Sequence, residues 1–335
     1  MAGPAIACGG LIAPNGAVNL VRTSTLVAYH DGVEHYVTSF EFAGDGGGKF
    51  GSIVPLPGVP SKVQKGGGWT LQRLQQEVAP PVTALRDSFA AAGSAVLNKA
   101  EVLLEKRIDA LDVTILKGGG DEVGLWAKEN GFALPPDSPE VLDFYAERSP
   151  IFMAAKFDVK EARSRGFGSG DGTPVHLTIP TPNPWVPLRI LGLGKAADER
   201  IEADVFMLTD GVPSMLPAAG TEGSGSGLIL ERQEVASDLL MTDLRSDRGM
   251  GWMPPSGMWF SYVRIDTTAG ELQHDLAIDQ SGYGTPSPVA AGLAEPGTTL
   301  LPRETGQTAL WLWAVAAGMA LAMLFGTDRL VASRR

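Results

Sequence analysis

The alternation of apolar and polar residues is clearest from Thr25 to Phe42, where it predicts a β-hairpin. Asp31-Gly32 is a preferred two-residue turn, and pairing about it places His30 opposite Val33. One face is then apolar and is predicted to pack on the core: Val27, Tyr29, Tyr36, Phe40 and Phe42. The other face is polar and is predicted to be wetter: His30, His35, Ser39 and Glu41. A third strand is predicted at Phe50–Val54.

A helical pattern replaces this alternation from Trp69 to Asp109. The run TLQRLQQEV (70–78) predicts a helix that Pro80-Pro81 end. The helix is expected to resume over residues 82–111, with charged residues on its solvated face: Lys99, Glu101, Glu105, Lys106 and Arg107. Two short helices follow, DEVGLWAKENG (121–131) and SPEVLDFYAERS (138–149), the second with Ser138 as its N-cap.

The remaining apolar runs are short and predict strands. They cover Leu111–Lys117, Ile151–Val159, Pro174–Ile179, Val186–Leu193, Ile201–Leu208, Gly227–Val235 and Trp259–Thr267. Strands lie at both ends of the chain with helices between them, and they do not alternate evenly with helices. The pattern therefore predicts an α+β fold of antiparallel β-sheets with a central helical segment, and not a doubly wound parallel sheet.

Gly306–Thr327 carries no charge and predicts one C-terminal transmembrane helix, because it is long enough to cross about 30 Å of hydrocarbon. A buried core helix is the alternative. Residues suited to the membrane interface lie near its start, Trp311 and Trp313, and after its end, Arg329, Arg334 and Arg335. The arginines predict that the tail, residues 328–335, is cytoplasmic and that the preceding domain lies outside the cytoplasm.

Residues 280–305 are rich in Gly, Pro, Ser and Thr and predict a stalk between this span and an α+β domain at 8–279. At the other end, Ala5-Ile6-Ala7 has the form of a signal-peptidase site without the apolar run that precedes one. We therefore interpret residues 1–7 as the remnant of a signal peptide and expect the mature chain to begin at Cys8. Lipidation of Cys8 is the alternative.

Charge and composition exclude some classes of partner and of site. The net charge is −11, and such an acidic surface repels phosphate backbones, so no nucleic-acid partner is expected. Cys8 is the only cysteine, so this chain alone can form neither a disulfide nor a cysteine-based metal site. The 42 glycines and 24 prolines indicate many turns, in keeping with β-structure.

The sequence contains few candidate residues for catalysis or for binding a metal or a phosphate group, and no cofactor is predicted. The loop GDGGGKFGS (44–52) fails as a phosphate-binding loop, because Phe50 stands where a magnesium-ligating Ser or Thr is needed. His30 and His35 lie diagonally on one hairpin face and are weak candidates for metal ligands, since a third ligand is not placed locally. Carboxylates are plentiful, so two of them could meet as a hydrolytic pair that the sequence does not identify.

The segment RGMGWMPPSGMWFSY (248–262) has the most unusual composition. If exposed, it would form a surface for a ligand or partner through its aromatic and sulfur-containing residues: Trp252, Met253, Met258, Trp259 and Tyr262. If buried, it packs on the core before the strand that follows, and we favour this alternative.

Several spaced motifs carry a resemblance to a known family: ACGG (7–10), GSIVPLPGVP (51–60), LWAKENGFALPP (125–136) and PVHLTIPTPNPWVPLRILGLG (174–194). Over roughly Ala7 to Asp210 the chain resembles the bacterial domain-of-unknown-function family number 2330. The resemblance implies an exported protein, often with a C-terminal span, and no established activity. Members often have a second cysteine soon after the first, where this chain has Leu11-Ile12-Ala13.

Three functional hypotheses follow. The first is a membrane-anchored, extracytoplasmic accessory or interaction module of the bacterial cell envelope, with the lipid bilayer and another membrane protein or envelope polymer as partners. The second is an envelope hydrolase that uses a carboxylate pair. The third is a metal-dependent enzyme that uses His30 and His35. A cleft with two close carboxylates, one of raised pKa, would favour the second, whereas a closed surface with an aromatic patch would favour the first.

Overall fold

The computed structural model describes residues 10–12, 23–40, 50–79, 100–158, 161, 164, 173–221, 225–280 and 284–297. The chain divides into two units, Met1–Pro296 and Gly297–Arg335. The elements below belong to the first unit. The predicted helix over residues 82–99, the glycine-rich loop at 44–49, Glu41 and Phe42 lie outside the described residues.

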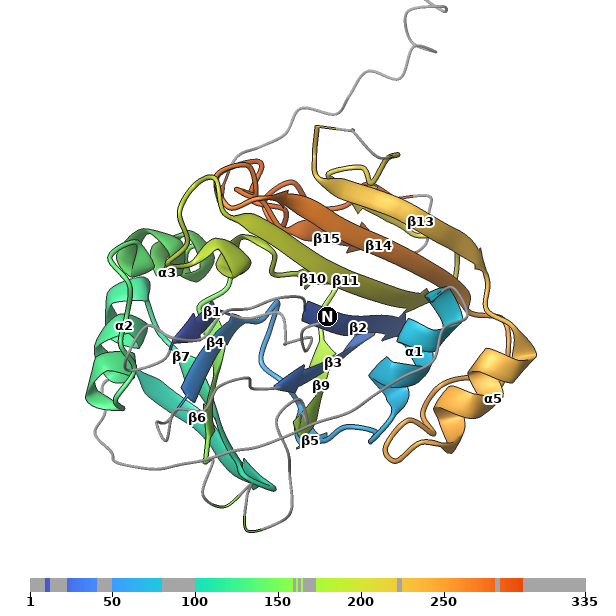
Figure 1. The fold of residues 1–335 in the computed structure, drawn as a ribbon, viewed down its shortest axis with the longest axis horizontal. Coiled ribbons are helices and arrows are strands. Elements are labelled where there is room, and N and C mark those ends of the chain that lie inside the picture. Colours follow the sequence, from blue (N-terminus) through green and yellow to red (C-terminus); the bar gives the residue numbers. More distant parts are fainter. Residues whose placement is uncertain are drawn as a thin grey trace, which may run out of the picture. The chain divides into compact units, whose positions relative to one another are not determined.

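Seven strands form the larger sheet, in the order β13-β14-β11-β2-β3-β9-β5 (Figure 1). They are β2 (Thr23–His30), β3 (Val33–Phe40), β5 (Lys62–Lys65), β9 (Thr173–Pro180), β11 (Arg200–Thr209), β13 (Leu228–Val235) and β14 (Trp259–Thr268). Neighbouring strands are antiparallel except β11 and β2, which run parallel. This parallel pair joins the N-terminal hairpin to the C-terminal strands in one sheet.

The hairpin of β2 and β3 has the predicted register, with His30 opposite Val33 and Ala28 opposite His35. Its turn residues Asp31 and Gly32 both have positive φ, 49° and 78°. Two successive positive φ angles suit the twist of the flanking strands, which is why Asp-Gly is preferred there.

A second sheet has five strands in the order β1-β4-β8-β7-β6, all antiparallel. They are β1 (Gly10–Ile12), β4 (Phe50–Pro55), β6 (Glu101–Ile108), β7 (Leu111–Lys117) and β8 (Ile151–Phe157). A small third sheet contains β10 (Trp185–Val186), β12 (Ser214–Leu216) and β15 (Leu276–Asp279). The predicted third strand thus exists as β4, but it pairs with β1 and β8 and not with the hairpin. The fold is mostly antiparallel β-sheet with a few helices, as an α+β prediction requires.

The predicted short helices are confirmed as α1 (Thr70–Val78), α2 (Gly120–Glu129) and α3 (Ser138–Ala146). The N-cap of α3 is Asp137, one residue before the predicted Ser138, which is the first helical residue. The helix α5 (Asp238–Ser246) was not predicted. Its start is a standard one, because the Ser237 hydroxyl accepts the N–H of Leu240 at 3.2 Å.

Two predicted elements are wrong in type. Glu101–Ile108 was predicted to be helical but forms strand β6, paired with β7 across a turn at Asp109, whose φ is +51°. Pairing along a whole strand outweighs the modest helix preference of its Glu, Lys and Leu residues. Val186–Leu193 was predicted as a strand, but only its first residue is in β10, and the 3-10 helix η1 (Arg189–Gly192) follows.

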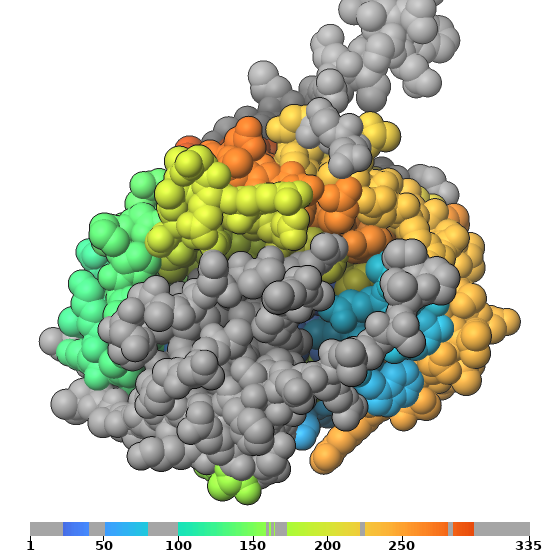
Figure 2. Space-filling view, in the orientation of Figure 1, coloured from blue at the N-terminus to red at the C-terminus, as the bar shows by residue number. Residues whose placement is uncertain are grey.

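The apolar core lies in three places. One cluster fills the space between the two large sheets and includes Val27 and Tyr36 from the hairpin and Val113 and Met153 from the second sheet. A second cluster packs α2 and α3 on the other face of the five-stranded sheet. The third packs α1, α5 and the methionines of segment 248–262 on the other face of the seven-stranded sheet. In Figure 2, α1 (cyan) and α5 (gold) are neighbours on one side of the visible surface.

This third cluster corrects the prediction of a wet hairpin face. Leu26, Ala28 and Val37 on that face are fully buried, and His35 is only 9% exposed. The cover comes from α5 and from a segment more than 200 residues away in sequence. A hairpin pattern reports only its own residues, so it cannot reveal a layer contributed by distant parts of the chain.

Part of the predicted stalk packs on this unit. Ala291 is fully buried, and its carbonyl accepts the N–H of Asp275 at 3.0 Å. Gly292 approaches the ring of Phe144 so closely that a Cβ there would lie 2.3 Å from it. The compact unit runs to Pro296 and therefore past the boundary at 279 that the sequence suggested.

Among the described residues, no helix combines the length and the apolar character needed to cross a membrane. The predicted span at 306–327 and its interfacial residues Trp311, Trp313, Arg329, Arg334 and Arg335 lie outside the described residues, as do residues 1–7 and Cys8.

Candidate functional site

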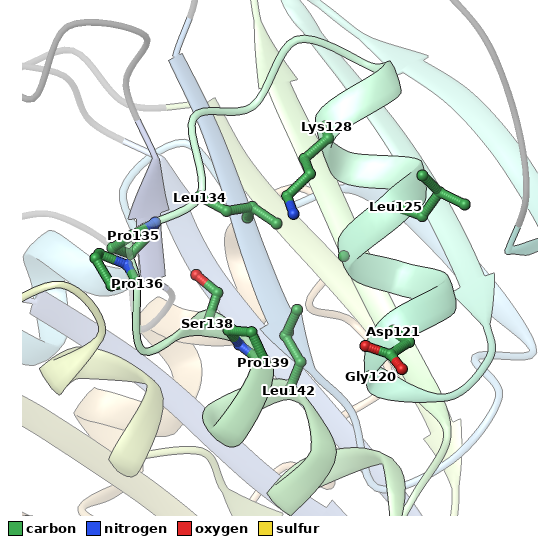
Figure 3. A pocket seen from close by; sticks show the side chains of 11 residues that line it. Gly120, Asp121, Leu125, Lys128, Leu134, Pro135, Pro136, Ser138, Pro139 and Leu142 are labelled. Carbon is green, nitrogen blue, oxygen red and sulfur yellow. The ribbon is translucent and has the colours of Figure 1, made fainter.

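A pocket of about 270 Å³ lies between α2 and α3 (Figure 3). Apolar side chains form most of its wall: Leu125, Leu134, Pro135, Pro136, Pro139 and Leu142. Leu125 is 38% exposed at its edge. An apolar concavity with a few polar groups is the usual form of a ligand site in proteins.

Local sequence explains how the pocket is held open. The α2 helix ends at Glu129, and Gly131 reverses the chain with a φ of +82° that favours glycine. After Pro135 the chain turns at residues 136–137, where the Ser138 N–H donates to the Pro135 carbonyl at 3.1 Å, and α3 begins at Ser138 with Pro139 in its first turn. At the other end of the pocket, Gly120 lets the two helices touch, because a Cβ there would lie 2.6 Å from the Asp143 backbone nitrogen.

Two polar groups of this pocket have no partner among the described residues. Ser138 is 1% exposed, and its hydroxyl makes no hydrogen bond. Lys128 is exposed on α2 and forms no ion pair with any described residue. In Figure 3 the Lys128 ammonium and the Ser138 side chain both point toward the part of the pocket beside Leu134. Asp121, the other charged lining residue, lies two turns away at the start of α2.

A second cluster, formed by His35, His176, Gln64 and Trp252, lies on the covered face of the larger sheet. His35 Nδ1 is 2.9 Å from His176 Nε2, and His176 Nδ1 is 3.0 Å from Gln64 Nε2. The Gln64 amide donates to His176 Nδ1, which places the His176 proton on Nε2, from where it is donated to His35 Nδ1. The Trp252 ring stacks on His35 with centroids 3.5 Å apart and planes at 4°.

Both imidazoles are neutral near pH 7. Burial, assisted by His176, His30 and Lys62, lowers the pKa of His35 from 6.5 to about 3. Burial and Lys62 lower the pKa of His176 to about 4. The groups that act on this pair are all cations when charged, so a second proton between the rings is opposed by both desolvation and repulsion.

His30 and His35, the weak candidates for metal ligands, have different partners in the structure. His30 Nδ1 lies 2.7 Å from Asp210 Oδ1, and its Nε2 lies 3.4 Å from Asp31 Oδ2. In the described part of the chain, no group of three or more His, Cys, Asp or Glu side chains is placed to hold a metal ion. The partner of His35 is His176, which the hairpin sequence alone does not indicate.

The segment 248–262 is fixed by Asp247, the residue that follows α5. Its carboxylate accepts the N–H groups of Gly68 at 3.1 Å and Trp69 at 3.0 Å, and the Thr70 hydroxyl at 2.8 Å, all at the start of α1. Of the five residues named as a possible surface, three are buried: Met253 (2% exposed), Met258 (0%) and Tyr262 (7%). Trp252 and Trp259 are partly exposed. Six of the fifteen residues of this segment are buried, among them its three methionines, and these belong to the core, the alternative that the sequence favoured, whereas residues 248, 249, 251 and 255–257 are exposed.

Two buried carboxyl groups have raised pKa values. Burial raises the pKa of Glu34 well above 4.5; the Trp185 backbone approaches it, yet neither oxygen receives a well-formed hydrogen bond from the described residues. Burial raises the pKa of Asp275 to about 7, although its Oδ1 accepts the Tyr145 hydroxyl at 2.8 Å. Neither group lines the α2–α3 pocket or the smaller pocket, of about 190 Å³, beside α3. These pockets therefore give no support to the hydrolase hypothesis.

Comparison with known proteins connects these sites to a family. A family model described as an uncharacterized protein conserved in bacteria, DUF2330, matches residues 2–210. The chain belongs to the DUF2330 family. No curated protein and no solved structure gave a match. The resemblance found in the sequence is thereby confirmed, and the family description assigns no activity.

The DUF2330 match covers the α2–α3 pocket and three residues of the histidine cluster, His35, Gln64 and His176. It ends before α5, Trp252 and Asp275. Sequence reasoning found the motif LWAKENGFALPP but used it only for the resemblance. That motif contains a leucine and a lysine on one helix, followed by a double proline, and these residues line the pocket.

Proposed function

We propose that this DUF2330 protein is a membrane-anchored interaction module of the bacterial envelope, whose α2–α3 pocket receives an apolar group of a partner. The pocket carries the proposal: it is apolar, preformed between two helices, and bordered by the exposed Leu125. Burying a leucine-sized group there would contribute about 1.5–3 kcal/mol. Such a contribution supports recognition within a larger contact at the envelope surface.

The proposed location rests on the sequence. The uncharged segment 306–327 is followed by three arginines, and this pattern favours a cytoplasmic tail with the domain outside. Protease added to intact cells, or to spheroplasts where an outer membrane is present, should remove the domain and spare a tag fused after Arg335. Loss of the tag with survival of the domain would reverse the proposed orientation.

The pocket is tested in cells with a photo-crosslinking residue in place of Leu125. A Cβ at Gly124 would meet only ordinary contacts, 3.7 Å from Leu134 and Leu142, so Gly124→Leu should fold and fill the pocket. We expect adducts at position 125 that disappear in the Gly124→Leu background. The control is the same crosslinker at Val59, which is 50% exposed in the loop between β4 and β5. Adducts at 125 that survive the filled pocket would overturn the proposal.

A further inference from the structure

We infer that the α2–α3 pocket binds a short apolar group that ends in a carboxylate, with Lys128 and Ser138 on the carboxylate and the leucines around the apolar part. The inference rests on the proposed function, because it takes the same pocket as the binding site. It adds the chemical class of the group that the pocket recognises.

The first observation is the charge at the pocket. Lys128 and Asp121 are its charged lining residues, and they stand seven residues apart on α2, which is about 10 Å along a helix. Neither forms an ion pair with a described residue, so the ammonium at one end of the pocket is not neutralised by the carboxylate at the other. Figure 3 shows the Lys128 ammonium toward Leu134, within the apolar part of the pocket. An anionic group beside Leu134 would pair with it.

The second observation, independent of the first, is the unpartnered Ser138 hydroxyl. A hydroxyl that is shielded from water and makes no hydrogen bond is costly, and native structures usually supply a partner from protein, water or ligand. An ammonium group only donates hydrogen bonds and a hydroxyl can donate one, so a ligand group that accepts two hydrogen bonds complements both. A carboxylate has two acceptor oxygens and a negative charge, whereas an amide offers one carbonyl oxygen and no charge.

The volume sets the size of the group that the pocket can enclose. About 270 Å³ is enough for a leucine-sized group with its carboxylate. Two sources share that chemistry: a free branched short-chain acid, and the C-terminal residue of a peptide.

Binding is measured by isothermal titration with the full-length chain in lipid nanodiscs, with empty nanodiscs as a blank. The probes are 4-methylpentanoate, its amide, and an acetylated dipeptide ending in leucine with a free carboxylate. We expect the acid to bind at least tenfold more tightly than the amide. Lys128→Gln should remove that preference, and Lys128→Arg should keep it. Lys117→Gln, which changes an exposed lysine on β7, should leave it unchanged.

Tighter binding of the dipeptide than of the acid identifies a peptide terminus as the source, and equal binding identifies the free acid. Equal affinity for acid and amide, or a preference that survives Lys128→Gln, overturns the inference, as does failure of both the acid and the dipeptide to bind. Ser138→Ala should weaken binding several-fold, and if that variant does not fold, the Lys128 variants decide alone. Crosslinking from position 125 in cells is a separate readout, so the proposed function can stand when the carboxylate inference fails.

Discussion

Replacing Asp275 by asparagine should remove part of the pH dependence of the free energy of unfolding. The carboxyl group of Asp275 is fully buried. Its Oδ1 accepts three hydrogen bonds, from the Tyr145 hydroxyl at 2.8 Å and from the N–H groups of Leu188 at 2.6 Å and Arg189 at 3.0 Å. Its Oδ2 has no partner among the described residues. Asparagine keeps an acceptor oxygen for the three donors and has no proton to lose.

The sign follows from proton linkage. Burial raises the pKa of Asp275 from 3.8 to about 7, so between these values the folded protein keeps a proton that the unfolded chain releases. The contribution of this group to the free energy of unfolding is therefore fully present below pH 3.8 and is lost as pH rises to 7. About three pKa units at 1.36 kcal/mol each amount to about 4 kcal/mol.

The measurement is urea unfolding of parent and Asp275→Asn protein at several pH values from 4 to 8. The stability of the variant minus that of the parent should rise by about 4 kcal/mol across this range. A constant cost of the substitution, such as an unpartnered amide N–H, cancels in this difference. Asp275→Ala is the control: it removes the acceptor for all three donors and should be less stable than Asp275→Asn at every pH. A difference between Asn variant and parent that stays flat from pH 4 to 8 would refute the reasoning.

Three further predictions need only melting or unfolding curves. Gly124→Ala should raise the melting temperature, because helix propensity gains up to about 1 kcal/mol and the new Cβ has room, whereas Gly131→Ala should lower it, because φ is +82° there. Protein ending after Pro296 should fold and melt at a higher temperature than protein ending after Asp279, which lacks the segment packed on α3; equal melting would contradict the packing. In His176→Gln, the loss of stability below pH 6.5 should be smaller than in the parent, and an unchanged acid slope would contradict the lowered imidazole pKa.

Local patterns predicted the elements whose partners are close in sequence. The turn and the register of the β2–β3 hairpin were predicted correctly, because Asp31-Gly32 fixes both. The helices α2 and α3 were found because their apolar spacing and the proline at the start of α3 are local signals. Arrangements that depend on distant partners were harder: β4 was predicted as a strand that follows the hairpin, but it pairs with β1 and β8. Residues 101–108 were missed for another reason, because their composition is helix-forming although their partner β7 begins only three residues after they end.

The candidate sites were less predictable than the fold, because their residues are brought together from distant parts of the chain. His35 was identified, but its partner His176 lies 141 residues away and its stacking partner Trp252 lies still farther along the chain. The choice of His30 as its companion followed from proximity on the hairpin, yet His30 is held by Asp210. Ser138 was read as a helix cap. Its unpartnered hydroxyl can be recognised only when the pocket around it is known.

The buried titratable groups change the stability of the protein in opposite directions as pH varies. The folded-state pKa values of His35 and His176 are lowered, to about 3 and about 4, so each makes the protein less stable as pH falls below 6.5. Those of Glu34 and Asp275 are raised, so each makes it less stable as pH rises, above 4.5 and 3.8 respectively. Between pH 3.8 and 6.5 Asp275 opposes the two histidines, each of these groups with a slope of about 1.36 kcal/mol per pH unit, and Glu34 adds to the opposition above pH 4.5.

This opposition predicts a broad plateau of stability and not a sharp optimum. Below pH 4.5 Glu34 is protonated in both states and no longer opposes the histidines, so the protein loses stability toward acid. Above pH 6.5 the histidines are neutral in both states and no longer offset Asp275, so the protein loses stability as pH rises to about 7. Removing one acid, as in Asp275→Asn, should therefore tilt the plateau and move maximum stability to higher pH. A maximum that stays in place would mean that the two pairs of groups do not balance one another.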